Sequence, residues 1–226
     1  MRILAIDTAA RLCAATVYDS VANAELGRSV RDLGKGHAEH VMGVIEEALG
    51  AAGCGYAGLS SVAVCVGPGS FTGVRVGVAA ARGLALALKI PATGVSTLEA
   101  LADEARAAFP GRPVLVVLGQ RPEQLFAAAF GSDGGVLLEP ASLSVEILAQ
   151  WAARENPVLC GSAAELVAAA SGRTFDMGAA DATADIATYA RLAAAKGDAG
   201  EKPRPLYLRA PEATPQQNFV LPRKEI

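Results

Sequence analysis

The sequence contains few of the residues that bind metals or form nucleophile–base pairs. Its 226 residues include two histidines and four cysteines, and no two cysteines stand in a CxxC spacing. This scarcity argues against a zinc site and against a disulfide scaffold. We expect Cys13, Cys54, Cys65 and Cys160 to be reduced thiols buried as small hydrophobic groups. HExxH and GxSxG motifs and a credible Ser/His/Asp set are also absent, so peptidase or esterase activity has little support.

A strong excess of positive or negative charge is absent as well. Charged residues make up 19% of the chain and the formal net charge is −3, so there is no global basic field to hold nucleic acid unaided. Asp7 interrupts the apolar start of the chain, which therefore lacks signal-peptide anatomy. The most apolar stretch, residues 74–90, carries Arg75, Arg82 and Lys89 and is not predicted to span a membrane. We expect a soluble, cytoplasmic protein.

Apolar residues are abundant, at 52% of the chain, which is enough to bury a full core in one large domain or two small lobes. Apolar runs, periodicity and turn residues predict two copies of one element order. The first copy has the order three strands, helix, strand, helix, strand, helix. Its strands are expected at 2–7, 13–19, 24–31, 61–66 and 92–95, and its helices at 37–52, 71–89 and 97–109. The second is weaker: strands at 113–118, 124–130, 135–139 and 157–160, and helices at 144–153, 162–170 and 185–196.

This doubled plan predicts an α/β fold of two ribonuclease H-like lobes, the actin/sugar-kinase/Hsp70 (ASKHA) class, facing each other across a cleft. We place the first lobe at residues 1–109 and the second at 110–211. Residues 212–226 are rich in proline and polar residues and are expected to be extended or disordered.

The nucleotide cleft of that fold class looks degraded. Asp7 and Thr8 end the first strand, where the class holds phosphate and magnesium. The turn after them lacks the glycine that lets a backbone approach phosphate. Asp7 is therefore either a metal-water contact or a hydrogen-bonded strand-end residue that holds the hairpin. In the second lobe Gly119 stands where an acid would be expected, and Gly161 stands alone where a Gly-Gly pair should cradle adenosine.

The stretch "VGPGSFTGVR" at residues 66–75 is neither a Walker loop nor a Rossmann fingerprint. Its simpler interpretation is mechanical: Gly67 and Gly69 bracket Pro68 in a tight turn, and Ser70 or Thr72 caps the following helix. The alternative is that the start of this helix binds an anion. The candidate residues of this degenerate nucleotide site or structural turn are Asp7, Thr8, Gly67, Pro68, Gly69, Ser70, Thr72 and Gly73.

The helix after this turn has two apolar faces separated by one polar edge, because Arg75, Arg82 and Lys89 recur every seven residues. A helix that only covers a sheet needs one such face. Either another helix of the chain or another protein covers the second, and the helix at 37–52 is the natural neighbour. The predicted partner interface comprises His37, Val41, Val44, Val76, Gly77, Ala80, Gly83, Leu84 and Ala87. His37 and His40 are spaced to share a metal, but no third ligand is evident, so no metal is predicted.

Four stretches together resemble the TsaB (YeaZ) family: "MRILAIDTA", "GHAEHVMGVIEEAL", "GPGSFTGVRVGVAAARGLALAL" and "GVSTLEALA". The resemblance is nearly continuous over residues 1–102 and returns at "PLYLR" (205–209). The family is a bacterial subunit in the synthesis of threonylcarbamoyl-adenosine in tRNA. His37 falls where the family usually has a histidine opening its first helix. The family commonly carries Asp-Ala-Arg where this chain has Gly119-Gln120-Arg121, which puts any residual ligand site there in doubt.

The resemblance implies a shortened second lobe and a non-catalytic scaffold. Such a scaffold pairs with a larger paralogue, TsaD, which carries the metal and transfers the threonylcarbamoyl group from its adenylate to the adenosine beside the anticodon. A small ATPase, TsaE, joins the complex. The same surface supports a homodimer when the protein is alone, and tRNA is contacted only through the complex. No cofactor is expected to bind tightly, and the complex interface is where an adenine nucleotide would lie.

Two alternatives stay open from the sequence. One is a homodimeric binding module that uses the same pair of helices. The sequence does not distinguish it from a scaffold, because one apolar patch could serve either partner. The other is a degenerate sugar- or acetate-kinase-like ATP-binding protein, against which the missing acid and Gly-Gly motif argue.

Overall fold

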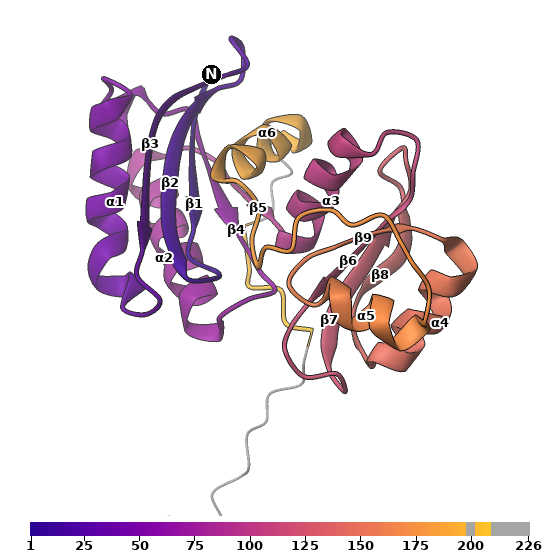
Figure 1. Cartoon of the computed structure of the whole chain (residues 1–226). Coiled ribbons are helices and arrows are strands. Elements are labelled where there is room, and N and C mark those ends of the chain that lie inside the picture. Colours follow the sequence, from indigo (N-terminus) through magenta and orange to yellow (C-terminus); the bar gives the residue numbers. More distant parts are fainter. Residues whose placement is uncertain (198–201, 209–226) are drawn as a thin grey trace, which may run out of the picture.

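A computed structural model describes residues 1–197 and 202–208 of the chain. Its first sheet has five strands in the order β3-β2-β1-β4-β5 (Figure 1). β1 pairs antiparallel with β2 and parallel with β4, and β5 adds a further parallel strand. The strands are β1 (Arg2–Asp7), β2 (Leu12–Asp19), β3 (Ala24–Asp32), β4 (Ser61–Cys65) and β5 (Ala92–Val95).

The second sheet has four strands in the order β8-β7-β6-β9, with β7 antiparallel between β6 and β8 and with β9 parallel to β6. It therefore repeats the first sheet without its last strand. The strands are β6 (Val114–Leu118), β7 (Leu125–Phe130), β8 (Val136–Leu143) and β9 (Val158–Cys160). The predicted fold class, two ribonuclease H-like lobes with a shortened second lobe, is confirmed. β8 runs beyond the predicted end at 139 because an edge strand tolerates Pro140.

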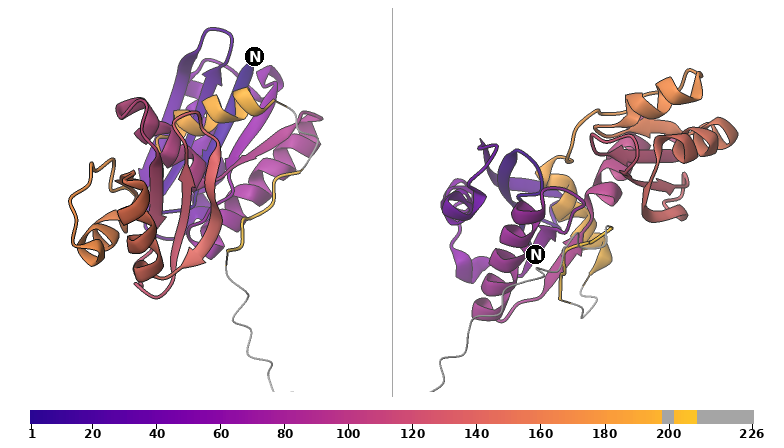
Figure 2. Two further views of the ribbon diagram at one scale, coloured as in Figure 1. Left: turned by 90° about the vertical axis from the view of Figure 1, so that its right-hand side faces the viewer. Right: turned by 90° about the horizontal axis from the view of Figure 1, so that it is seen from below.

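Helices cover both sheets. α1 (His37–Ala51) and α2 (Phe71–Leu88) lie side by side on one face of the first sheet, with the short 3₁₀ turn Tyr56–Gly58 between α1 and β4 (Figure 2). α3 (Thr97–Ala108) packs on the second sheet. It begins at a capping box in which Ser96 and Glu99 bond each other's backbone N–H. α4 (Val145–Glu155) and α5 (Ala164–Ser171) pack together beside the second sheet's other face.

The last helix, α6 (Ile186–Lys196), returns to the first sheet and covers the face opposite α1 and α2 (Figure 1). Ile186, Tyr189 and Ala190 belong to the same hydrophobic core as β1 and β4. That core continues through α3 to Val116 and Phe130 of the second sheet. A boundary at 109/110 thus separates the two sheets, but α6 places part of the C-terminal half in the first lobe. The tail at 212–226 lies outside the described residues.

The four cysteines are free thiols, as expected, and three of them are buried. Cys13, Cys65 and Cys160 are buried free thiols, and Cys54 is half-buried. Burial raises the pKa of Cys13 to about 11 and that of Cys160 to about 12, so both are protonated near neutral pH.

Among the described helices α2 is long and apolar enough to cross a membrane by length and composition, although the sequence predicts no span there. Val74, Val78 and Ala81 pack its inner face onto the sheet.

Candidate partner-binding surface

The glycine-rich stretch forms a tight turn between β4 and α2. Gly67 has a φ of 91° and precedes Pro68 through a cis peptide bond. Ser70 is the N-cap of α2, and its hydroxyl accepts a hydrogen bond from the backbone N–H of Gly73 at 3.2 Å. Thr97 of α3 fastens the turn, donating from its hydroxyl to the Pro68 carbonyl at 3.0 Å and from its backbone N–H to the Gly67 carbonyl at 2.8 Å. Of the two predicted caps, Ser70 is confirmed and Thr72 is not the cap.

The remaining glycines bring α2 into direct contact with the first hairpin. A Cβ at Gly69 would lie 2.3 Å from the Ala9 carbonyl oxygen, and one at Gly73 would lie 2.0 Å from that of Thr8. Only glycine permits this approach. The backbone N–H of Ser70 donates to the Ala9 carbonyl at 2.6 Å, so it is not free for a phosphate. The geometry therefore supports the structural turn.

Asp7 is enclosed rather than open to a cleft. It is 2% exposed, and its carboxylate accepts hydrogen bonds from the Ala9 backbone N–H at 2.8 Å and from the Thr183 hydroxyl. The Thr183 hydroxyl in turn lies 2.7 Å from that of Tyr189 in α6. Desolvation raises the pKa of Asp7, while its hydrogen bonds to Thr183 and Ala9 oppose that rise. The segment that carries α6 thus occupies the space beside Asp7, which acts as a hydrogen-bonded strand-end residue.

In the second hairpin Gly119 occupies the position where an acid that complements Asp7 is expected. Gly119, Gln120 and Arg121 follow β6, and the Gly119 backbone N–H lies 3.4 Å from the Ser162 hydroxyl. Gly161 has a φ of 94°, and a Cβ there would lie 2.4 Å from the Val117 carbonyl oxygen. Gly161 is therefore required for packing against β6. Within the described residues no group of three or more His, Cys, Asp or Glu side chains could hold a metal ion.

The structure corrects the predicted partner interface at four positions. Val41 and Val44 of α1 are 4% and 0% exposed and belong to the core. Gly77 is buried, and a Cβ there would lie 2.5 Å from the Thr8 hydroxyl oxygen. His37 is 6% exposed rather than solvated, and its Nε2 has no hydrogen-bond partner in the described structure. These residues face the sheet because the apolar stripe that the periodicity identified on each helix is the side that packs on the sheet.

The other predicted residues lie on the outer side of α2. Gly83 and Ala87 are exposed, whereas Val76, Ala80 and Leu84 are half-buried. Glu47 of α1 bonds Ser29 and Arg31 of β3, so the opposite flank of α1 is the one beside α2. Met42 is on that flank and is 42% exposed. We define the α1–α2 surface as Met42, Gly43, Val76, Ala79, Ala80, Gly83 and Ala87.

Sequence reasoning missed Met42, Gly43 and Gly50 in α1. Gly43, Gly50 and Gly83 interrupt helices, where glycine costs about 1 kcal/mol relative to alanine. Apart from the helix's own backbone, no described atom lies within 4 Å of a Cβ built at any of the three. Packing inside the chain therefore does not explain these glycines, unlike Gly73 and Gly77. Gly43 and Gly50 lie seven residues apart on the polar side of α1, and this spacing is the sequence signal that could have identified them.

Comparison with known proteins agrees with this arrangement. The family model for tRNA N6-adenosine threonylcarbamoyltransferase (TsaD) matches residues 31–182. The TsaB protein of Escherichia coli is 34% identical over 134 residues, which are 59% of this chain and 56% of that protein. TsaB of Bacillus subtilis is 33% identical over 164 residues, 70% of this chain and 69% of that protein. The chain thus spans little more than half the length of the first of these relatives.

Solved structures agree over a longer stretch. YeaZ from Pseudomonas aeruginosa superposes with a TM-score of 0.73 at 26% identity, covering 92% of this chain and 99% of that one. A second structure from that organism, described as similar to the peptidase YeaZ, gives 0.75 at the same identity and coverage. The family model, the sequence relatives and the shared two-lobed fold show that the chain belongs to the TsaB (YeaZ) family.

Proposed function

We propose that this chain is a non-catalytic scaffold subunit in the synthesis of threonylcarbamoyl-adenosine in tRNA. In this proposal it pairs through the α1–α2 surface with a larger TsaD paralogue, which performs the transfer, and the ATPase TsaE joins the complex in the cytoplasm. The same surface supports a homodimer when TsaD is absent. An adenine nucleotide, where present, lies at the interface between subunits rather than in this chain.

The observation that carries the proposal is the set of unexplained helix glycines. Gly43 leaves the backbone of α1 uncovered. Gly83 does the same for α2, between exposed Ala79 and Ala87, which lie four residues away on either side. Small residues at such positions let a second pair of helices approach closely, so that packing against them offsets the low helix propensity of glycine. The family to which the chain belongs supplies the pathway, because its named members are tRNA threonylcarbamoyladenosine biosynthesis proteins.

The enclosure of Asp7 supports the absence of a kinase-like activity. A sugar or acetate kinase needs an open cleft with an acid on each hairpin. Here Thr183 bonds Asp7, and Gly119 replaces the second acid. We expect the purified protein not to hydrolyse ATP appreciably, as measured by phosphate release. Robust turnover would favour the kinase-like alternative.

Size-exclusion chromatography with light scattering tests the scaffold role directly. The full chain is run alone, mixed with TsaD from the same genome, and mixed with TsaD, TsaE and ATP. We expect a homodimer that gives way to a 1:1 complex with TsaD. A homodimer that persists in every mixture would instead support the homodimeric binding module.

A further inference from the structure

One edge of α2 and the segment 202–208 form a basic surface in an otherwise acidic protein. Residues 71–92 and 202–208 contain no Asp or Glu, whereas the whole chain has a net charge of −3. Their cationic residues are Arg75, Arg82, Lys89, Lys202 and Arg204. Arg75 and Arg82 lie seven residues apart on one edge of α2. Lys89, the C-cap residue of the helix, lines the same cavity as Arg82. That edge faces β5 and the segment 202–208, away from the flank of α2 beside α1.

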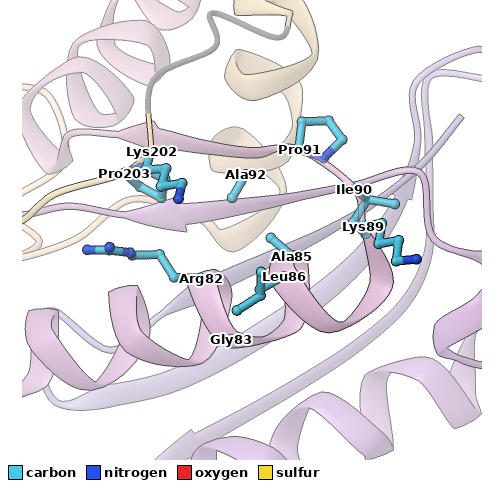
Figure 3. Close-up of a pocket in the computed structure, with 10 residues that line it drawn as sticks. All are labelled: Arg82, Gly83, Ala85, Leu86, Lys89, Ile90, Pro91, Ala92, Lys202 and Pro203. Carbon is cyan, nitrogen blue, oxygen red and sulfur yellow. The ribbon is translucent and has the colours of Figure 1, made fainter.

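A cavity of about 650 Å³ lies along this edge. Figure 3 shows Arg82 and Lys202 on the two sides of the opening, with Lys89 at the far end of the helix. We call this cavity the basic groove; its lining residues are Arg82, Gly83, Ala85, Leu86, Lys89, Ile90, Pro91, Ala92, Lys202 and Pro203. The lining thus combines three cations with apolar walls and contains no acid.

The cations of the groove have no partner in the described part of the chain. No salt bridge or hydrogen bond of the Arg82, Lys89 or Lys202 side chains occurs there, whereas Arg28 and Arg191 each bond a carboxylate. Like charges that converge on one cavity raise each other's energy, and an anion relieves that repulsion. The charge of the groove is therefore complementary to an anionic ligand.

An aromatic cluster continues the basic groove toward the start of α2. The Arg75 guanidinium lies 3.7 Å from the centre of the Phe71 ring and 5.6 Å from that of Tyr207. Its Nε donates a hydrogen bond of 2.8 Å to the Tyr207 hydroxyl, which holds the segment 202–208 against α2. Phe71 and Tyr207 are nonetheless 57% and 53% exposed. Exposed rings beside unneutralised cations are the combination with which proteins bind single-stranded RNA, through phosphate contacts and base stacking.

We propose that the basic groove binds the RNA phosphate backbone, with Phe71 and Tyr207 as a stacking platform for an unpaired base. That this RNA is tRNA rests on the proposed function. The groove then supplies phosphate contacts from this subunit once the complex has formed. Because it has few cations, we expect the chain alone to bind RNA weakly. An acidic protein segment would satisfy the charges but would leave the exposed rings without a role.

The test measures binding of an unmodified tRNA transcript by fluorescence anisotropy over a range of salt concentrations. It uses the wild-type chain, the double variant Arg82→Gln/Lys202→Gln and the control Arg2→Gln/Arg154→Gln. The control removes the same charge from exposed arginines elsewhere. Each protein is measured alone at low salt and in complex with TsaD.

We expect the groove variant to weaken binding on the order of tenfold and to reduce the salt slope by roughly one to two, while the control matches wild type. Equal affinities for the variant and wild type, or equal losses in the variant and control, would overturn the proposal. A groove variant that fails to assemble with TsaD but binds RNA normally would also overturn it, because the groove would then be a protein interface.

The two proposals fail separately. If wild type forms no complex with TsaD, the scaffold function fails, and the groove is still judged from RNA binding by the isolated chain. If the complex forms and the variant binds RNA as wild type does, only the groove proposal fails.

Discussion

The Thr8 hydroxyl donates a hydrogen bond of 2.7 Å to the carbonyl oxygen of Gly73 and joins the first hairpin to the first turn of α2. Gly73 makes this possible, since its Cα approaches the Thr8 carbonyl more closely than any other residue could. The position of α2, and with it that of the α1–α2 surface, depends on this contact.

Gly73→Ala is therefore expected to destabilise the fold by about 3 kcal/mol, because the new methyl group overlaps backbone atoms that cannot move independently. Gly50→Ala is the control: it changes a helix glycine that has open space around it and lies outside the α1–α2 surface, and it should stabilise the protein by up to about 1 kcal/mol. Urea unfolding measures both. Equal effects of the two substitutions would contradict the packing role assigned to Gly73.

Asp7→Asn should change how stability depends on pH. The pKa of Asp7 is raised in the folded state by burial, so the folded protein holds the proton more tightly than the unfolded chain does. The stability contributed by that proton is present at low pH. It is lost as pH rises from the ordinary aspartate value of about 4 through the raised pKa. Asp7→Asn lacks this loss, so its stability relative to wild type should grow between pH 4 and pH 8. A constant difference across that range, in urea unfolding, would mean that Asp7 titrates normally.

Thr183→Val removes the hydroxyl that bonds the buried Asp7 carboxylate. We expect a loss of about 1–3 kcal/mol, because a buried carboxyl oxygen of Asp7 then lacks one hydrogen-bond partner. The loss should shrink in an Asp7→Asn background, since the two residues act through one bond. Thr72→Val, at an exposed helical threonine, should stay within about 0.5 kcal/mol of wild type. Additive effects of Thr183→Val and Asp7→Asn would exclude the coupling.

Ala79→Glu should prevent pairing without unfolding the protein. Ala79 is exposed on α2, so the isolated chain tolerates a carboxylate there, whereas close contact with another helix does not. We expect at least a tenfold loss of affinity for TsaD in a titration, with an unchanged far-ultraviolet circular dichroism spectrum. Ala170→Glu, on exposed α5 in the second lobe, is the control. A normal titration for Ala79→Glu would place the interface elsewhere.

The helices and strands were largely predictable because their signals are local. α1 begins at His37 and α2 at Phe71, as predicted, and the end of β5 at Val95 also agrees. Whether an individual side chain of α1 or α2 faces the sheet or the solvent was harder to predict. Val41 and Gly77 lie on stripes that fit a core or an interface equally well, and the position of the sheet decides between them.

The amino-acid sequence by itself determined the element order, the doubled α/β plan, the shortage of catalytic groups and the family. These follow from residue type and spacing along the chain. Only the tertiary structure decided that α6 returns to enclose Asp7 through Thr183, and that Lys202 faces Arg82 across a groove. Both relationships join residues more than a hundred positions apart, and no local periodicity or propensity encodes which distant surfaces pack together.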